Sequence, residues 1–170
     1  MPFGEVGVHT SEGGETVALW HKGSFTLIKQ KKEEILLWLR EKNLLVPSHW
    51  VVVFLDDPKN RWAEWVRMEI CFPLPEEYPP DLWEGEMRLY KRIFPPELVL
   101  SLPYVGYEDW EEVITGYYLI EKWLAEHRCW RSGCFREIYP VHAEEGEEIS
   151  ILLQVPIEVE TPELLTLGTS

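Results

Sequence analysis

The sequence predicts an α+β fold of two pseudo-symmetric halves, each in the order strand, helix, strand, strand, with both helices on one side of a mostly antiparallel sheet. The strongest observation is an internal repeat. Three pairs of landmarks recur at nearly constant spacing: Gly23 and Gly106 (83 residues), Trp38 and Trp123 (85 residues), and Pro73 and Pro156 (83 residues). A duplication of this length places a cleft at the seam between the halves, where small ligands commonly bind.

In the first half we expect a strand over residues 16–22, a helix over 26–42, and strands over 49–55 and 64–72. The helix is predicted because apolar residues between Leu27 and Leu39 recur at three- and four-residue steps, as one buried helix face requires. The first strand after the helix is rich in Val and aromatic residues, which favour strands. The turn Asp56-Asp57-Pro58 ends it.

In the second half we expect strands over residues 86–94 and 98–102, a helix after Gly106, and strands over 133–139 and 149–155. The acidic residues between Glu108 and Glu112 suit a helix start, because negative charge complements the positive end of the helix dipole. Apolar residues from Val113 to Leu124 then supply the buried helix face.

The length of 170 residues fits one domain with a substantial core. We expect a single domain over residues 1–160, with repeat one at about 15–75, a linker at about 76–87 and repeat two at about 88–158. The linker is predicted because Pro and Gly are frequent between residues 73 and 85 and no hydrophobic period runs through them. Residues 159–170 form a C-terminal tail without a strong pattern.

Composition narrows the class of protein. The formal net charge is −14, from 16 Lys and Arg against 30 Asp and Glu, which argues against a nucleic-acid partner. Such charge steers cations toward the protein, although solubility alone also explains it. The sequence contains no apolar run long enough for a membrane span and no signal peptide at its start, so we expect a cytoplasmic protein. The chain has only four Asn and Gln residues and abundant Glu, which indicates heat adaptation.

The cysteines and histidines do not predict a metal site or a cofactor. The three cysteines, Cys71, Cys129 and Cys134, have no ligand spacing, and the five histidines are scattered singly. We therefore expect no cofactor and no metal.

One acidic residue stands out on the predicted strands. Side chains alternate across a strand, so Phe135, Glu137 and Tyr139 share one face. Trp50 and Phe54 occupy the corresponding face of the equivalent strand in the first half. The mate of Glu137 is Val52, which means that this acid is present once. A carboxylate between aromatic walls attracts cations. The alternative is that Glu137 pairs with a neighbouring Arg at a sheet edge.

Other residues near the predicted cleft are weaker candidates. Tyr107 and Trp110 lie at the start of the second helix and either reach the cleft or belong to its rim and the core. Glu69 is a second acid on a strand, with Arg67 expected beside it to keep it ionised. Trp62 and Trp65 follow the Asp-Pro turn, where they either cover the cleft or clamp the turn.

The ordered set of landmarks resembles the GyrI-like small-molecule-binding domain, which is also the effector-binding fold of BmrR-type and some AraC-type activators. The resemblance covers about residues 15–158. The matching features are one glycine before each helix (Gly23 and Gly106), the Asp-Pro turn, the strand Arg136-Glu137-Ile138-Tyr139 and the closing Val155-Pro156-Ile157. This chain is similar to the stand-alone members, without an attached DNA-binding region.

The resemblance implies roles for particular residues. Glu137 matches the cleft glutamate that meets cationic aromatic drugs in the family. Members of the family often carry a second glutamate on the last strand. Leu152 stands at the matching position here, while the corresponding residue of the first half, Glu69, is acidic.

Three functions follow from the residues and the resemblance. The first is capture of cationic or amphipathic aromatic compounds, of the multidrug type, by a monomer or homodimer. The second is hydrolysis of reactive cyclopropane-bearing genotoxins, with Glu137 as general base and Tyr139 or Tyr107 as proton donor. The third is protein interaction such as gyrase inhibition, which net charge alone supports.

Overall fold

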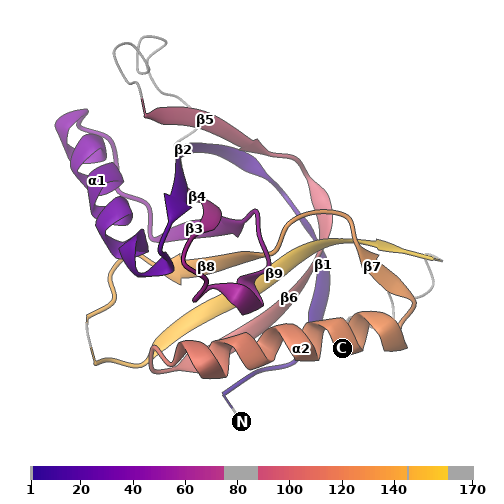
Figure 1. Ribbon diagram of the computed structural model, residues 1–170. Helices are drawn as coiled ribbons and strands as arrows, with labels where there is room; N and C mark the ends of the chain where they lie inside the picture. The colour runs from indigo at the N-terminus through magenta and orange to yellow at the C-terminus, as the bar shows by residue number, and fades with distance from the viewer. Residues whose placement is uncertain (1, 75–87, 145, 161–170) are drawn as a thin grey trace.

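The computed structural model, which describes residues 2–74, 88–144 and 146–160, confirms the α+β fold (Figure 1). The strands of these residues are β1 (Gly7–Ser11), β2 (Gly14–Gly23), β3 (His49–Phe54), β4 (Val66–Pro73), β5 (Leu89–Phe94), β6 (Glu97–Gly106), β7 (Cys129–Arg131), β8 (Arg136–Pro140) and β9 (Ile149–Val159). The α-helices are α1 (Ile28–Glu41) and α2 (Trp110–Glu126), and the 3₁₀ turns are η1 (Phe25–Leu27) and η2 (Pro58–Asn60).

The main sheet is antiparallel and has the order β1-β6-β9-β8-β3-β4-β2-β5, while β7 pairs with β9 outside this path. Strands β6-β9-β8 of the second half mirror β2-β4-β3 of the first, and the halves meet where β8 pairs with β3. At this junction Val52 lies directly opposite Glu137. The two mated positions of the repeat therefore face one another across the pseudo-twofold axis, which confirms the internal symmetry.

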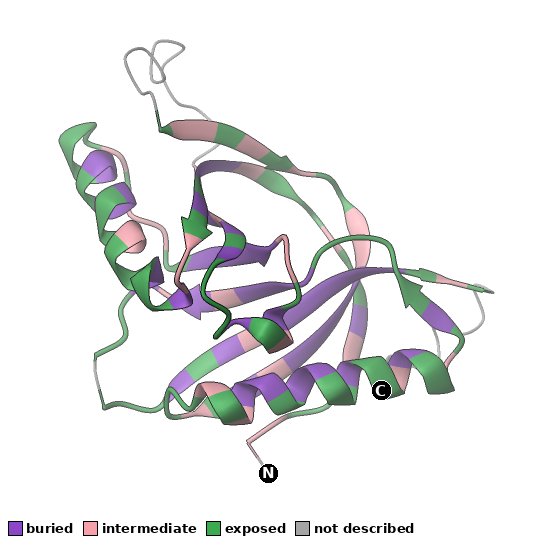
Figure 2. Ribbon diagram, viewed as in Figure 1, coloured by how far each residue is buried: buried purple, intermediate pink, exposed green. Residues whose placement is uncertain are grey.

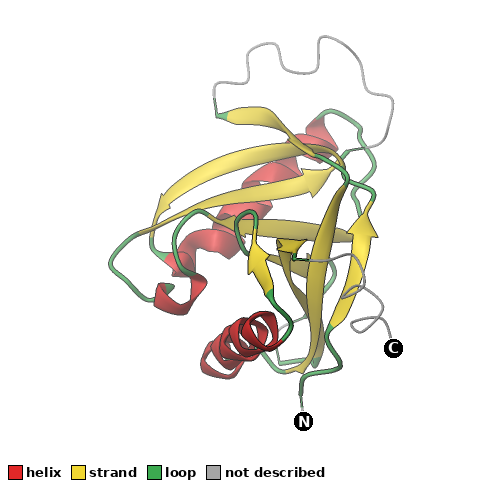
Figure 3. Cartoon of the chain, turned by 90° about the vertical axis from the view of Figure 1, so that its right-hand side faces the viewer, coloured by secondary structure: helices red, strands yellow, loops and turns green. Residues whose placement is uncertain are grey.

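Both helices pack on the same face of the sheet. Buried residues of α1, such as Leu39, and of α2, such as Tyr117, join one large core with Val52 and Leu153. The opposite face carries a smaller apolar cluster built without either helix, from Ala18, Val51, Val53 and Cys71. Figure 2 shows buried central strands and helices exposed on their outer sides, and Figure 3 shows how far the sheet curls.

The structure differs from the sequence-based elements mainly at their ends. Strands β1 and β7 lack any strong sequence pattern and were not predicted; β1 adds to the edge of the sheet beside β6. Helix α2 begins at Trp110, because the Asp109 side chain caps it by accepting a hydrogen bond from the Glu112 amide at 3.2 Å. Strand β4 begins at Val66, two residues later than expected. The predicted linker, 76–87, lies outside the described residues, as does most of the predicted tail.

Helix α2 approaches the sheet closely at Gly116. A Cβ atom at this position would lie 2.7 Å from the Phe3 side chain and 2.8 Å from that of Leu153. Both contacts are closer than van der Waals packing allows, so the helix position depends on the missing side chain. Gly7 on β1 has room for a side chain, because a Cβ atom there would meet nothing within 4 Å.

We predict that Gly116→Val lowers the free energy of unfolding by about 1–3 kcal/mol, because it overpacks the interface between α2 and the sheet. The same change at Gly7 is the control and should leave stability almost unchanged. Urea unfolding of both variants measures this. A Gly116→Val midpoint equal to that of the wild type would show that α2 does not pack this closely.

Candidate functional site

Glu137 lies at the centre of the molecule, where the two halves meet, and is completely buried. Its partner is Arg61, which is also 0% exposed. The guanidinium binds the carboxylate with two parallel hydrogen bonds: Nη2 donates to Oε2 at 2.6 Å and Nη1 to Oε1 at 3.2 Å. Two opposite charges are thus held out of water in a bidentate pair, the geometry in which such a pair is strongest.

Two tyrosine hydroxyls complete the coordination of this carboxylate. Tyr117 of α2 donates to Oε2, and Tyr139 of β8 donates to Oε1. With the two bonds from Arg61, each carboxylate oxygen accepts two hydrogen bonds. An ionised carboxylate offers about four acceptor positions, so Glu137 has none left for a water molecule or a ligand in this structure.

Aromatic rings surround the guanidinium. The Arg61 Cζ lies 4.8 Å from the ring centre of Phe25, 5.1 Å from that of Phe54, 5.5 Å from that of Trp110 and 6.0 Å from that of Tyr117. Ring faces attract cations at these distances, most strongly when water is excluded. We call Glu137 and the rings of Phe25, Phe54, Trp110, Tyr117 and Tyr139 the cage.

Electrostatics fix the protonation states of Tyr117, Tyr139 and Arg61. Burial, together with the nearby Glu137 carboxylate, raises the pKa of Tyr117 and of Tyr139 well above the usual tyrosine value. Burial by itself would lower the pKa of Arg61, but the Glu137 carboxylate outweighs this and raises it. Both phenols therefore stay neutral donors and Arg61 stays charged at any physiological pH.

Five of the predicted site residues meet at or beside the cage. Glu137, Tyr139, Phe54 and Trp110 belong to it, and Phe135 packs edge-on against Tyr117 at 4.9 Å between ring centres. The predicted alternation is confirmed, because Phe135, Glu137 and Tyr139 lie on the same face of the sheet, the one that the helices cover.

Two further predicted residues lie further out. Trp50 stacks on Tyr139 with ring centres 4.9 Å apart, which places it one layer outside the carboxylate. Tyr107 is 62% exposed, and its backbone carbonyl accepts a hydrogen bond from the buried Tyr104 hydroxyl.

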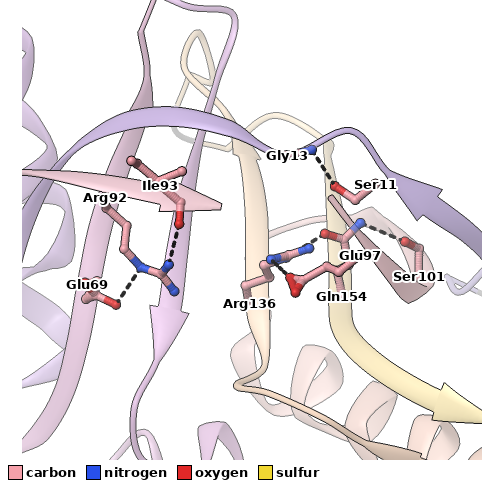
Figure 4. A network of polar contacts seen from close by, with 9 residues as sticks. All are labelled: Ser11, Gly13, Glu69, Arg92, Ile93, Glu97, Ser101, Arg136 and Gln154. Carbon is pink, nitrogen blue, oxygen red and sulfur yellow. Dashed lines mark hydrogen bonds and ion pairs between the residues drawn. The ribbon is translucent and has the colours of Figure 1, made fainter. Parts of the chain in front are cut away.

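Glu69 does not join the cage. In β4 its neighbour Ile70 pairs with Val52, which places Glu69 on the opposite face of the sheet. There it accepts a hydrogen bond from the Tyr90 hydroxyl at 2.6 Å. It accepts another from Arg92 Nε at 3.2 Å (Figure 4). The expected role of Arg67 beside it is wrong, because Arg67 binds Asp56 instead.

The helix-free face carries a second polar network. Arg136 donates from Nε to Gln154 at 2.6 Å and from Nη1 to Glu97 at 3.2 Å, and Gln154 donates to Ser101 (Figure 4). Arg136 also lines a cavity of about 270 Å³ beside the β1–β2 turn. Adjacent residues 136 and 137 thus serve different faces of the sheet, as strand alternation predicts.

Small cavities flank the cage on its solvent side. One of about 60 Å³ is lined by Phe25, Trp62, Trp110 and Lys29. Another of about 130 Å³ is lined by Trp50, Tyr139, Lys29 and Glu108, among others. Lys29 lines both cavities, and Glu108, its partner in an ion pair 2.5 Å long, lines the larger one. The cleft between the halves therefore exists as two small spaces with the filled cage beneath them.

Sequence reasoning missed Arg61, Phe25 and Tyr117. Pairing of Glu137 with an arginine was the alternative weighed above, but the partner comes from the loop after β3 and not from a neighbouring position at a sheet edge. No strand or helix period extends into this loop, so no sequence pattern shows where Arg61 points.

Within the described ranges, no group of three or more His, Cys, Asp or Glu side chains is arranged to hold a metal ion. Among the same residues, no helix has the length and apolar composition needed to cross a membrane.

Comparisons with known proteins identify the fold. No protein-family model and no curated protein sequence matches the chain. Among solved structures, the C-terminal domain of EcmrR is similar with a TM-score of 0.72 and 13% identity, covering 94% of this chain and 99% of that one. The chain spans 59% of EcmrR as seen in a complex with DNA.

Two further structures have the same fold. A hydrolase from Listeria innocua is similar with a TM-score of 0.67 and 12% identity, over 91% of this chain and 92% of that one. SAV2435 bound to tetraphenylphosphonium is similar with a TM-score of 0.59 and 9% identity, over 91% of this chain and 94% of that one. The effector-binding fold that the sequence resemblance implied is therefore the fold of this chain.

Proposed function

We propose that this protein binds cationic aromatic small molecules, with Glu137 as the group that receives the positive charge. One observation carries the proposal: the cage already holds an organic cation, the Arg61 guanidinium, between a carboxylate and four rings and out of contact with water. Groups arranged to hold one organic cation in a dry site are suited to hold another.

The physics of the cage favours cations over neutral molecules. A buried carboxylate that loses its positive partner is destabilised by about 3–5 kcal/mol. A neutral ligand in place of Arg61 would leave the charge of Glu137 uncompensated. The rings add attraction for a cation that a neutral group does not receive. The net charge of −14 raises the local concentration of cations around the whole molecule.

The similar structure of SAV2435 with tetraphenylphosphonium also supports the proposal, because it is an instance of this fold with an organic cation bound. The Listeria neighbour described as a hydrolase would favour the alternative in which Glu137 activates water. That role requires a water molecule to replace Arg61 on Glu137, which would leave the buried carboxylate without a positive partner, whereas a cationic ligand would supply one. Binding is therefore the better supported function.

We predict that Glu137→Gln weakens binding of 2-naphthamidinium far more than binding of 2-naphthamide, its neutral analogue of nearly equal size. Loss of one partner from a desolvated charge contact costs on the order of 2–5 kcal/mol, and the neutral compound does not make that contact. Calorimetric titration of both compounds measures the difference.

Glu69→Gln is the matched control, because it removes an acid from the opposite face of the sheet and should change neither affinity. Equal weakening of both compounds by Glu137→Gln would show that this side chain acts through packing alone, and would overturn the charge-based proposal.

We predict that the wild type leaves an electrophilic aryl cyclopropane unchanged, since a neutral water molecule in place of Arg61 would leave the buried Glu137 carboxylate without a positive partner. Mass spectrometry of the mixture follows product formation. Product that the wild type and Glu69→Gln make, and Glu137→Gln does not, would instead identify the protein as a hydrolase with Glu137 as its base.

A further inference from the structure

We infer that Arg61 is an internal occupant of the ligand site, which a ligand must displace, and that the site therefore selects planar cations with two parallel N–H donors, such as aryl amidines and guanidines. The inference rests on the proposed function and adds to it the ligand class and the residue that determines it.

Arg61 reaches the cage from the surface. It belongs to residues 56–65, which lie within the connection between β3 and β4 and which we call the strap. Within the strap, Pro58 and Arg61 are buried and the other residues are exposed or half-buried, Trp62 being 48% exposed. The Arg61 Nε donates to the Pro58 carbonyl at 3.0 Å, so the strap itself orients the side chain inward.

Apart from the buried Pro58 and Arg61, the strap is held down by contacts near the surface. Lys59 pairs with Glu121 of α2 and lies over the Tyr118 ring at 5.3 Å. Trp62 packs perpendicular to the Phe25 ring, with ring centres 5.5 Å apart. The Lys59 side chain is half-buried and that of Glu121 is exposed, and ion pairs open to solvent on one side contribute little to stability. Because β3 ends at Phe54 and β4 begins at Val66, the strap can lift without breaking any strand pairing.

Withdrawal of Arg61 would open the cage toward solvent. Trp62 and Phe25 line the 60 Å³ cavity beside it, so removal of the strap joins that cavity to the space of the guanidinium. Glu137 would keep the hydrogen bonds from Tyr117 and Tyr139 and lose the two from Arg61. A ligand that restores two parallel N–H donors, with an aromatic body among the rings, fits what is left.

An internal occupant lowers the apparent affinity of a ligand by the fraction of molecules in which the cage is open. Removal of Arg61 should therefore have opposite effects on two measurements. Stability falls, because Glu137 is left buried and unpaired, while affinity for a cation rises, because the competitor is gone. A residue with a structural role alone would lower both.

Chemical rescue tests the occupancy directly. Ethylguanidinium has the side-chain atoms that Arg61→Ala removes, and ethylurea is its neutral counterpart. At saturating concentration, ethylguanidinium should raise the Tm of Arg61→Ala by about 5 °C or more. It should have no such effect on the wild type or on Arg61→Ala/Glu137→Gln, and ethylurea should have none on any of the three. Equal shifts with both compounds, or none, would overturn the inference.

Calorimetric titration with 2-naphthamidinium tests the competition. Arg61→Ala should bind it about tenfold or more tightly than the wild type does. Arg92→Ala is the matched control, because Arg92 pairs with Glu69 on the opposite face of the sheet; its affinity should equal that of the wild type. Binding to the wild type and Arg61→Ala with the same affinity would overturn this inference while leaving the proposed function intact, whereas binding to neither would overturn the proposed function itself.

Lys59→Ala provides a variant that keeps the buried pair, in case Arg61→Ala does not fold. It loosens the strap from α2 and should raise the affinity for 2-naphthamidinium while changing the Tm little. An affinity equal to that of the wild type would show that the strap does not have to lift.

Discussion

The buried pair of Glu137 and Arg61 is the interaction on which the centre of this protein depends. Both side chains lie entirely out of water at the junction of the two halves. Such a pair persists only where the remaining donors and acceptors are satisfied, and two tyrosines and a ring of aromatic side chains meet that need here. The positions of α2, β8 and the strap are thus coupled through four hydrogen bonds to one carboxylate.

The duplication explains how aromatic residues from distant parts of the chain converge on that carboxylate. Phe25 and Phe54 come from the first half, and Trp110 and Tyr117 come from the second. The two halves differ at the equivalent positions 52 and 137, where Val52 lies opposite Glu137 on the pseudo-twofold axis. A second acid there would put two like charges within one dry site, which is strongly unfavourable.

The sequence predicted what repeats and periods can reveal. Constant spacing of paired residues predicted the two halves, and strand alternation predicted that Glu137 shares a face with Phe135 and Tyr139. Alternation along a single strand does not show how two strands register, and this is why Glu69 was grouped with Glu137 although β4 places it on the other face. Its true partner, Arg92, comes from β5, beyond a segment without any period.

Arg61 shows a different limit of sequence reasoning. Its direction is set by the Pro58 carbonyl and by the shape of a short loop, neither of which follows from composition or spacing. A basic residue between Asn60 and Trp62 has the same appearance in the sequence as a solvated surface residue.

If the site receives cations as proposed, the Arg61 guanidinium also solves a problem that any receptor for cations faces when it is empty. A carboxylate buried deeply enough to discriminate charge cannot stay unpaired, and an apolar plug would fill the space without neutralising it. A guanidinium does both, because its fork matches the carboxylate and its flat faces pack on rings. Arg61 arrives on a loop that makes few buried contacts, so the same side chain can hold the cage closed and still be replaced. The features that would make the site selective for cations therefore also require that the protein supply one of its own.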